Sequence, residues 1–129
     1  MVEIKSIDKK FRIGIVVCIA FIIILTILEF PAPIGFETRP QDNVSMGWLF
    51  FFLTIVITEI ATIPLIFTKP KLGSVFGIVA GSLNILQVIA DQLHLMQPEV
   101  APPGYTLIEY SVAAISLVLI YLSSKSART

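Results

Sequence analysis

Charged residues are scarce in this 129-residue chain, and their scarcity excludes most kinds of soluble protein. Only 14% of the residues are charged, whereas 56% are hydrophobic, and a soluble domain averages about 25% charge. Disordered chains, coiled coils and nucleic-acid-binding domains need far more charge, and the formal net charge is zero. The composition predicts an integral membrane protein of one domain (1–129), with the lipid bilayer around it and no nucleic-acid partner.

Cysteine and catalytic motifs are also lacking. The one cysteine, Cys18, excludes an internal disulfide and a thiolate metal cluster. The sequence has no Ser/His/Asp set, no phosphate-binding glycine loop, no Cys-x-x-Cys motif and no pair of histidines for haem. These absences argue against a stand-alone enzyme. They predict no catalytic residue and no cofactor, apart from the metal ion considered below.

What the chain does have is four apolar runs, each close to the ~20 residues that a helix needs to cross about 30 Å of hydrocarbon. We expect the spans at residues 13–30, 46–67, 72–96 and 107–123. Strands of a membrane barrel would alternate polar and apolar residues, and these runs do not. The predicted fold class is all-α, an integral membrane four-helix bundle formed by a single four-span domain.

The lysines and arginines gather on one side of these spans. They precede the first span, lie between the second and third, or end the chain, and Arg39 alone falls on the other side. Cytoplasmic loops carry such an excess of cations. We therefore expect a multi-pass protein of the cell membrane with cytoplasmic N- and C-termini and an uncleaved first span. Proline-rich loops at 31–45 and 97–106 would then face outward.

The third span carries two kinds of residue on one face. Gly73, Gly77 and Gly81 recur every four residues, a spacing that lets helix backbones approach closely. Towards the outer end the same face carries the polar residues Asn84, Gln87, Asp91 and His94. At about 100° per residue, these positions fall within about 140° of arc. Because polar groups are costly in hydrocarbon, we expect this face to look inward onto neighbouring helices.

Glu59 lies deep in the second span. An acid at such a depth is a candidate functional residue, and desolvation favours its neutral form, which suits a proton carrier. It also fits a structural role, as a protonated acid that bonds across to Ser82 or Asn84 and holds two helices together. Both interpretations remain open at this stage.

Two more patterns lie near the outer end. Asp91 and His94 place a carboxylate and an imidazole one turn apart, a pair that suits zinc, copper or iron. The alternative is an ion pair in which the histidine also bonds a loop carbonyl. Thr106 and Glu109 have the spacing of a capping box, in which both side chains satisfy backbone donors at the start of the fourth span.

The layout resembles the DoxX-like family of small four-span membrane proteins. The similar features are the basic start with Arg12 and Gly14, Glu59 in the second span, the basic turn Lys69–Lys71, glycines Gly77 and Gly81, and His94. Some members of that family are subunits of quinone-linked oxidoreductases. The resemblance therefore implies a role as a subunit.

Three functions follow as hypotheses. The first is a non-catalytic accessory or scaffolding subunit of a larger membrane complex of respiratory or oxygenase type, whose partners are other membrane subunits or further copies of the chain. The second is an oligomeric transporter or channel coupled to protons or cations, with Glu59 and Asp91 carrying charge. The third is a metal-holding site at the outer face around Asp91 and His94.

Overall fold

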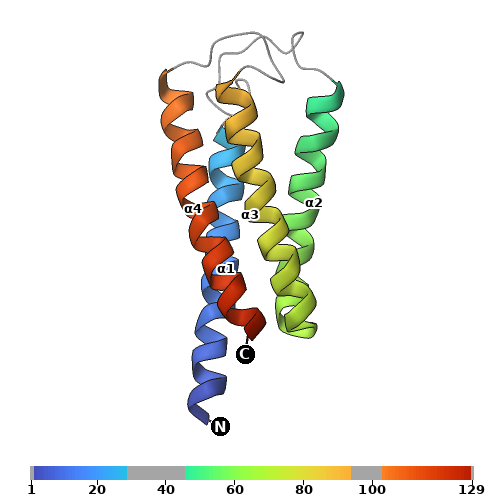
Figure 1. Cartoon of the computed structure of the whole chain (residues 1–129), viewed down its shortest axis with the longest axis vertical. Coiled ribbons are helices and arrows are strands. Elements are labelled where there is room, and N and C mark those ends of the chain that lie inside the picture. Colours follow the sequence, from blue (N-terminus) through green and yellow to red (C-terminus); the bar gives the residue numbers. More distant parts are fainter. Residues whose placement is uncertain (1, 29–45, 94–102, 129) are drawn as a thin grey trace.

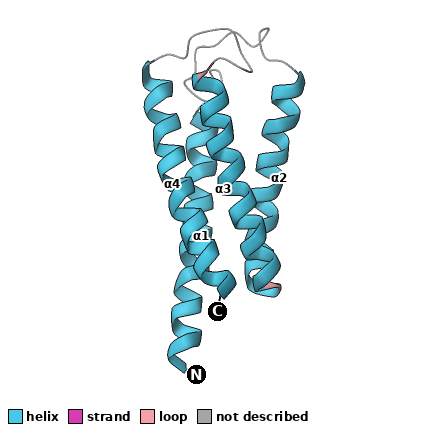
Figure 2. Cartoon of the chain, in the orientation of Figure 1, coloured by secondary structure: helices cyan, strands magenta, loops and turns pink. Residues whose placement is uncertain are grey.

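Four helices arranged side by side make up the described part of the chain. The computed structural model describes residues 2–28, 46–93 and 103–128. The helices are α1 (Val2–Leu28), α2 (Met46–Thr68), α3 (Pro70–Gln92) and α4 (Pro103–Arg128). Within the described segments, only Lys69 and Leu93 lie outside a helix (Figure 2).

The helices run alternately up and down (Figure 1). The start of α1, the end of α4 and the turn between α2 and α3 therefore lie at one end of the bundle, which we call the terminal end. The opposite end, where α2 and α4 begin, is called the far end. Each helix is long and apolar enough to cross a membrane. The predicted all-α fold with four spans is confirmed to this extent.

The helix ends differ from the expected span limits. α1 begins at Val2, well before the apolar run, because hydropathy marks only the stretch suited to hydrocarbon and a helix can continue beyond it. α4 begins at Pro103, because proline is favoured at the first helical position. Residues 103–106 of the expected outer loop are thus helical. The remainder of both expected loops lies outside the described residues, as do residues 94–96 of the expected third span.

The tightest connection is the single residue Lys69 between α2 and α3. Its N–H donates to the carbonyl of Leu65 (2.7 Å), and its own carbonyl accepts from the N–H of Gly73 (2.8 Å). Pro70 follows at the first position of α3, where its missing N–H needs no partner. α2 and α3 therefore form an antiparallel hairpin.

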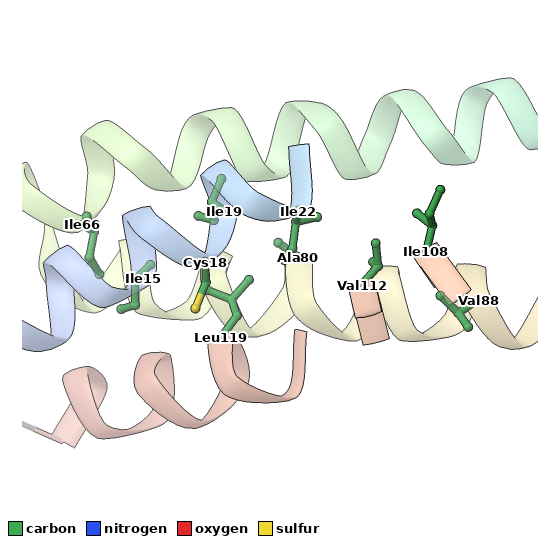
Figure 3. Packing of buried hydrophobic residues seen from close by; sticks show 10 residues of the cluster. All are labelled: Ile15, Cys18, Ile19, Ile22, Ile66, Ala80, Val88, Ile108, Val112 and Leu119. Carbon is green, nitrogen blue, oxygen red and sulfur yellow. The ribbon is translucent and has the colours of Figure 1, made fainter. Parts of the chain in front are cut away.

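The bundle is closed mainly around α3. This helix packs along both α2 and α4, α4 also packs on α1, and α1 contacts α2 only slightly. A larger share of α3 is buried than of any other helix, so α3 is the central helix of the bundle. Apolar side chains from all four helices fill the interior along the bundle (Figure 3): Ile15, Cys18, Ile19, Ile22, Ile66, Ala80, Val88, Ile108, Val112 and Leu119.

Candidate functional site

One face of α3 turns inward along the whole helix. Its buried residues include the three glycines of the predicted series and the polar residues Asn84, Gln87 and Asp91. Leu86, Ile89 and Leu93 point outward and are exposed. The expectation that the polar face looks onto neighbouring helices is therefore confirmed for every described member, and His94 lies outside the described residues.

Asn84 bonds Glu59 across the interface between α3 and α2. The Nδ2 of Asn84 donates to Oε1 of Glu59 at 2.6 Å and to the backbone carbonyl of Ala80 at 3.0 Å. A carbonyl can only accept, so the second bond fixes which end of the amide faces Ala80. Asn84 is thus one of the two partners expected for Glu59, whereas Ser82, the other, is exposed.

Glu59 sits near the middle of the predicted bilayer. It is 1% exposed, and nine residues at about 1.5 Å each place it roughly 14 Å from the end of α2 at Thr68. Its Oε2 and the Oδ1 of Asn84 have no hydrogen-bond partner among the described residues. A buried polar atom without a partner is costly in an apolar interior. The hydrogen bonds therefore fix the orientation of the Glu59–Asn84 pair, but each of the two side chains keeps one buried oxygen without a hydrogen bond among the described residues.

A second polar contact joins α3 to α4 at the far end. Nε2 of Gln92 donates to Oε2 of Glu109, and the Glu109 side chain is buried. Sequence analysis missed Gln92. Gln92 lies about 20° from Gly81 in helical projection, and Gly81 packs against α4. Helical periodicity could therefore have placed Gln92 on the side of α3 that faces α4.

The capping-box interpretation of Thr106 and Glu109 is wrong for this helix. α4 begins at Pro103, so Thr106 lies inside the first turns and not at the helix start. The proline moved the start upstream because its fixed φ suits the first helical position. Glu109 instead accepts the interhelical bond from Gln92.

The proposed metal pair is described only in part. Asp91 is 1% exposed on the inward face of α3, while His94 lies outside the described residues. The described ranges contain no group of three or more histidine, cysteine, aspartate or glutamate residues placed to hold a metal ion. The metal site stays a prediction.

The glycines of α3 occupy the other half of the inward face and bring backbones together. A Cβ added at Gly73 would lie 2.6 Å from the Cα of Ile66 on α2. One at Gly81 would lie 3.0 Å from the carbonyl oxygen of Ser116 on α4, and one at Gly77 would collide with Oγ of Ser123. Small residues are needed at all three places, as the spacing predicts.

Buried serines complete this half of the interface. Ser74, Ser116 and Ser123 are fully buried, and their hydroxyls have no hydrogen-bond partner among residues 2–28, 46–93 and 103–128. Ser123 faces Gly77 and Ser116 faces Gly81. Serine is small enough to sit opposite glycine in a close helix crossing.

No protein-family model, curated protein or solved structure matches this chain. The resemblance to the DoxX-like family thus stays a prediction.

Proposed function

We propose that the chain is a non-catalytic accessory or scaffolding subunit of a larger membrane complex. The observation that carries the proposal is that polar side chains of α3 are hydrogen-bonded to the neighbouring helices. Asn84 is bonded to α2 and Gln92 to α4, and large apolar side chains cover the outside of all four helices: Phe21, Ile57, Leu86 and Leu117 among them. A bundle held together from within and apolar outside suits a subunit whose exterior meets lipid and neighbouring subunits.

We assign the terminal end to the cytoplasmic side of the cell membrane. Lys9 and Lys10 on α1, with Lys69 and Lys71 at the turn after α2, are exposed at that end, and the positive-inside rule favours it for the cytoplasm. The DoxX-like resemblance supports a complex of respiratory or oxygenase type. Fusing a reporter enzyme to either terminus would test the orientation, because activity is expected only for cytoplasmic reporters.

The subunit proposal is tested by purifying the native protein in mild detergent from the membranes in which it naturally occurs. We expect other membrane chains to co-purify in fixed ratio. A photo-crosslinking residue placed on the exposed side of each helix, at Val17, Ile57, Val79 and Leu117 in turn, would show which face meets them. A lone monomer with no crosslinked product at any of the four positions would contradict the proposal.

A second candidate is an oligomeric transporter or channel coupled to protons or cations. The observation that favours it is the unpartnered Oε2 of Glu59 near the middle of the bundle, because ionisable groups at this depth mark proton and ion pathways. A four-helix bundle has a filled core, so a pathway for a larger cation would need several copies. Flux into liposomes that is unchanged by Glu59→Gln and by Asp91→Asn would exclude this candidate.

The third candidate is a metal ion held near the far end by Asp91 and His94. A carboxylate and an imidazole one turn apart support it. Metal content in the purified protein, compared with that of His94→Ala, tests it. Equal content in the two proteins would end the proposal.

A further inference from the structure

On the inward face of α3, long polar side chains lie between the level of Glu59 and the far end, whereas the buried polar residues on the terminal side are small: Thr62, Ser74, Ser116 and Ser123. Asn84, Gln87 and Asp91 are all buried on the inward face of α3. At about 1.5 Å per residue, they are separated by roughly 4.5 and 6 Å along the helix axis, distances that an amide side chain or one water molecule spans. We call these three residues the polar strip. It begins beside Glu59 and ends near the far end of α3.

The chemistry of the strip suits water. Oε2 of Glu59 and Oδ1 of Asn84 are buried oxygens without a partner among the described residues, and the two bonds donated by Nδ2 hold the amide in place. A water molecule donates to such acceptors and commonly satisfies buried polar atoms that have no protein partner. Phe52 and Ile55, on the half of α2 between Glu59 and the far end, are buried apolar residues.

In the other direction the packing is closed. Beyond Asn84, towards the terminal end, the inward face of α3 becomes Gly81, Gly77 and Gly73, which lie directly against α4 and α2. The fully buried side chains of Ile66, Ile15 and Leu119 fill the same half of the bundle, and Figure 3 shows Ile66 beside Ile15. Backbones this close leave no room for a chain of water molecules.

We propose that Glu59 exchanges a proton with the far end of the bundle along the polar strip and is sealed from the terminal end by the glycine contacts of α3. On release, the O–H bond of the Glu59 carboxyl group breaks, and the proton passes to a water oxygen in the strip and from there to the aqueous phase. The electron pair stays on the carboxylate, which keeps the bond from Asn84. Uptake reverses these steps.

Other titratable groups lie around this path. On α3, Asp91 ends the strip, and α4 contributes Glu109, both of them buried. α1 contributes the buried thiol of Cys18. The described cations of α1, of the α2–α3 turn and of α4 belong to the terminal end, away from the strip: Lys9, Lys10, Arg12, Lys69, Lys71 and Lys125. Of the three buried acids Asp91, Glu109 and Glu59, Glu59 lies farthest from the far end.

The inference concerns access to Glu59 and holds whether the chain is a subunit or a transporter. Its test measures access alone. Co-purification tests the subunit proposal, and flux into liposomes tests the transporter proposal. A negative result in either experiment is therefore distinguishable from a negative result in the measurement of access to Glu59.

The direct test of access is the rate at which silver ions modify introduced cysteines. In a Cys18→Ala background, Gln87→Cys places a thiol in the strip, Leu86→Cys places one at the same depth on the exposed side of α3, and Ser123→Cys places one in the glycine contact. Thiols react as thiolates and need water, so we expect Gln87→Cys to be modified about tenfold faster than either control. Equal rates at Gln87→Cys and Leu86→Cys, or fast modification of Ser123→Cys, would overturn the proposal.

A second measurement avoids cysteine variants. The infrared carbonyl stretch of a protonated Glu59, assigned by its loss in Glu59→Gln, shifts on transfer to D₂O. Gln87→Leu keeps the side-chain volume but interrupts the strip, so we expect exchange to slow by about tenfold while helix content is unchanged. An unaltered exchange rate in Gln87→Leu, or no Glu59 band in the wild-type protein, would contradict the proposal.

Discussion

The two halves of the inward face of α3 achieve helix packing by opposite means. At Gly73, Gly77 and Gly81 the absence of a side chain lets the neighbouring helices come close. The nearest neighbours are the backbone of Ile66, the hydroxyl of Ser123 and the side chain of Ile120. Between Asn84 and Gln92, side chains are long and polar and reach across to acids on α2 and α4. We expect the first half to be sensitive to an added atom and the second half to the loss of a bonding partner.

Gly73→Ala is expected to have the largest effect. The new Cβ would meet backbone atoms of Ile66 at 2.6 Å, and backbone cannot rotate away as a side chain can. Overpacking of this kind costs about 3 kcal/mol at the upper end of its usual range. Unfolding in mixed micelles with increasing denaturing detergent measures the loss.

Gly47→Ala is the matched control, because a Cβ at Gly47 meets nothing within 4 Å. We expect its stability to equal or slightly exceed that of the wild type, since alanine favours helix more than glycine does. Similar losses for both substitutions would mean that close approach is not what the glycines provide.

Gly77→Ala comes next and can be rescued. Its Cβ collides with the hydroxyl of Ser123, while the Cβ of Ser123 lies 3.1 Å away, so the conflict is with one removable atom. We expect a loss of about 2 kcal/mol for Gly77→Ala. In the double variant Gly77→Ala/Ser123→Ala, a coupling of about 1 kcal/mol should reduce it. Strict additivity of the two changes would contradict the direct contact.

The inward face could be predicted from sequence, because helical periodicity fixes the angle of each residue about the helix axis. Angle alone predicted that Asn84 and Asp91 are buried. It does not say which helix lies at a given angle, and so the choice between Ser82 and Asn84 as the partner of Glu59 stayed open. Ser82 lies about 160° from Asn84 on the helix and is exposed.

The contact between Gln92 and Glu109 could not be predicted from the sequence, for a different reason. It joins residues on two helices whose mutual register depends on where each helix begins, and the sequence placed the start of α4 at Leu107. The structure begins α4 at Pro103. Hydropathy marks the membrane-suited stretch, whereas proline geometry determined the helix start.

Asn84→Ala tests the polar half and should cost less, about 1 kcal/mol, because it removes one interhelical hydrogen bond and leaves Oε1 of Glu59 without its donor. Glu59→Gln is the control, since its carbonyl still accepts from Asn84, and we expect a smaller loss. Should Glu59→Gln be the more damaging of the two, the acid contributes more than an acceptor, and the structural interpretation of the pair is insufficient.

Thr54→Val should have the smallest effect, although Thr54 lies at about the same depth as the polar half of α3. Its hydroxyl donates to the carbonyl of Phe50 in its own helix at 2.8 Å and its side chain is exposed. Valine has nearly the same shape, and the Phe50 carbonyl keeps its helical N–H donor. We therefore expect a change within about 0.5 kcal/mol in the same denaturation experiment. A loss of stability as large as that of Asn84→Ala would show that polar side chains at this depth contribute to stability whether they face inward or outward. The distinction between inward and outward polar residues would then fail.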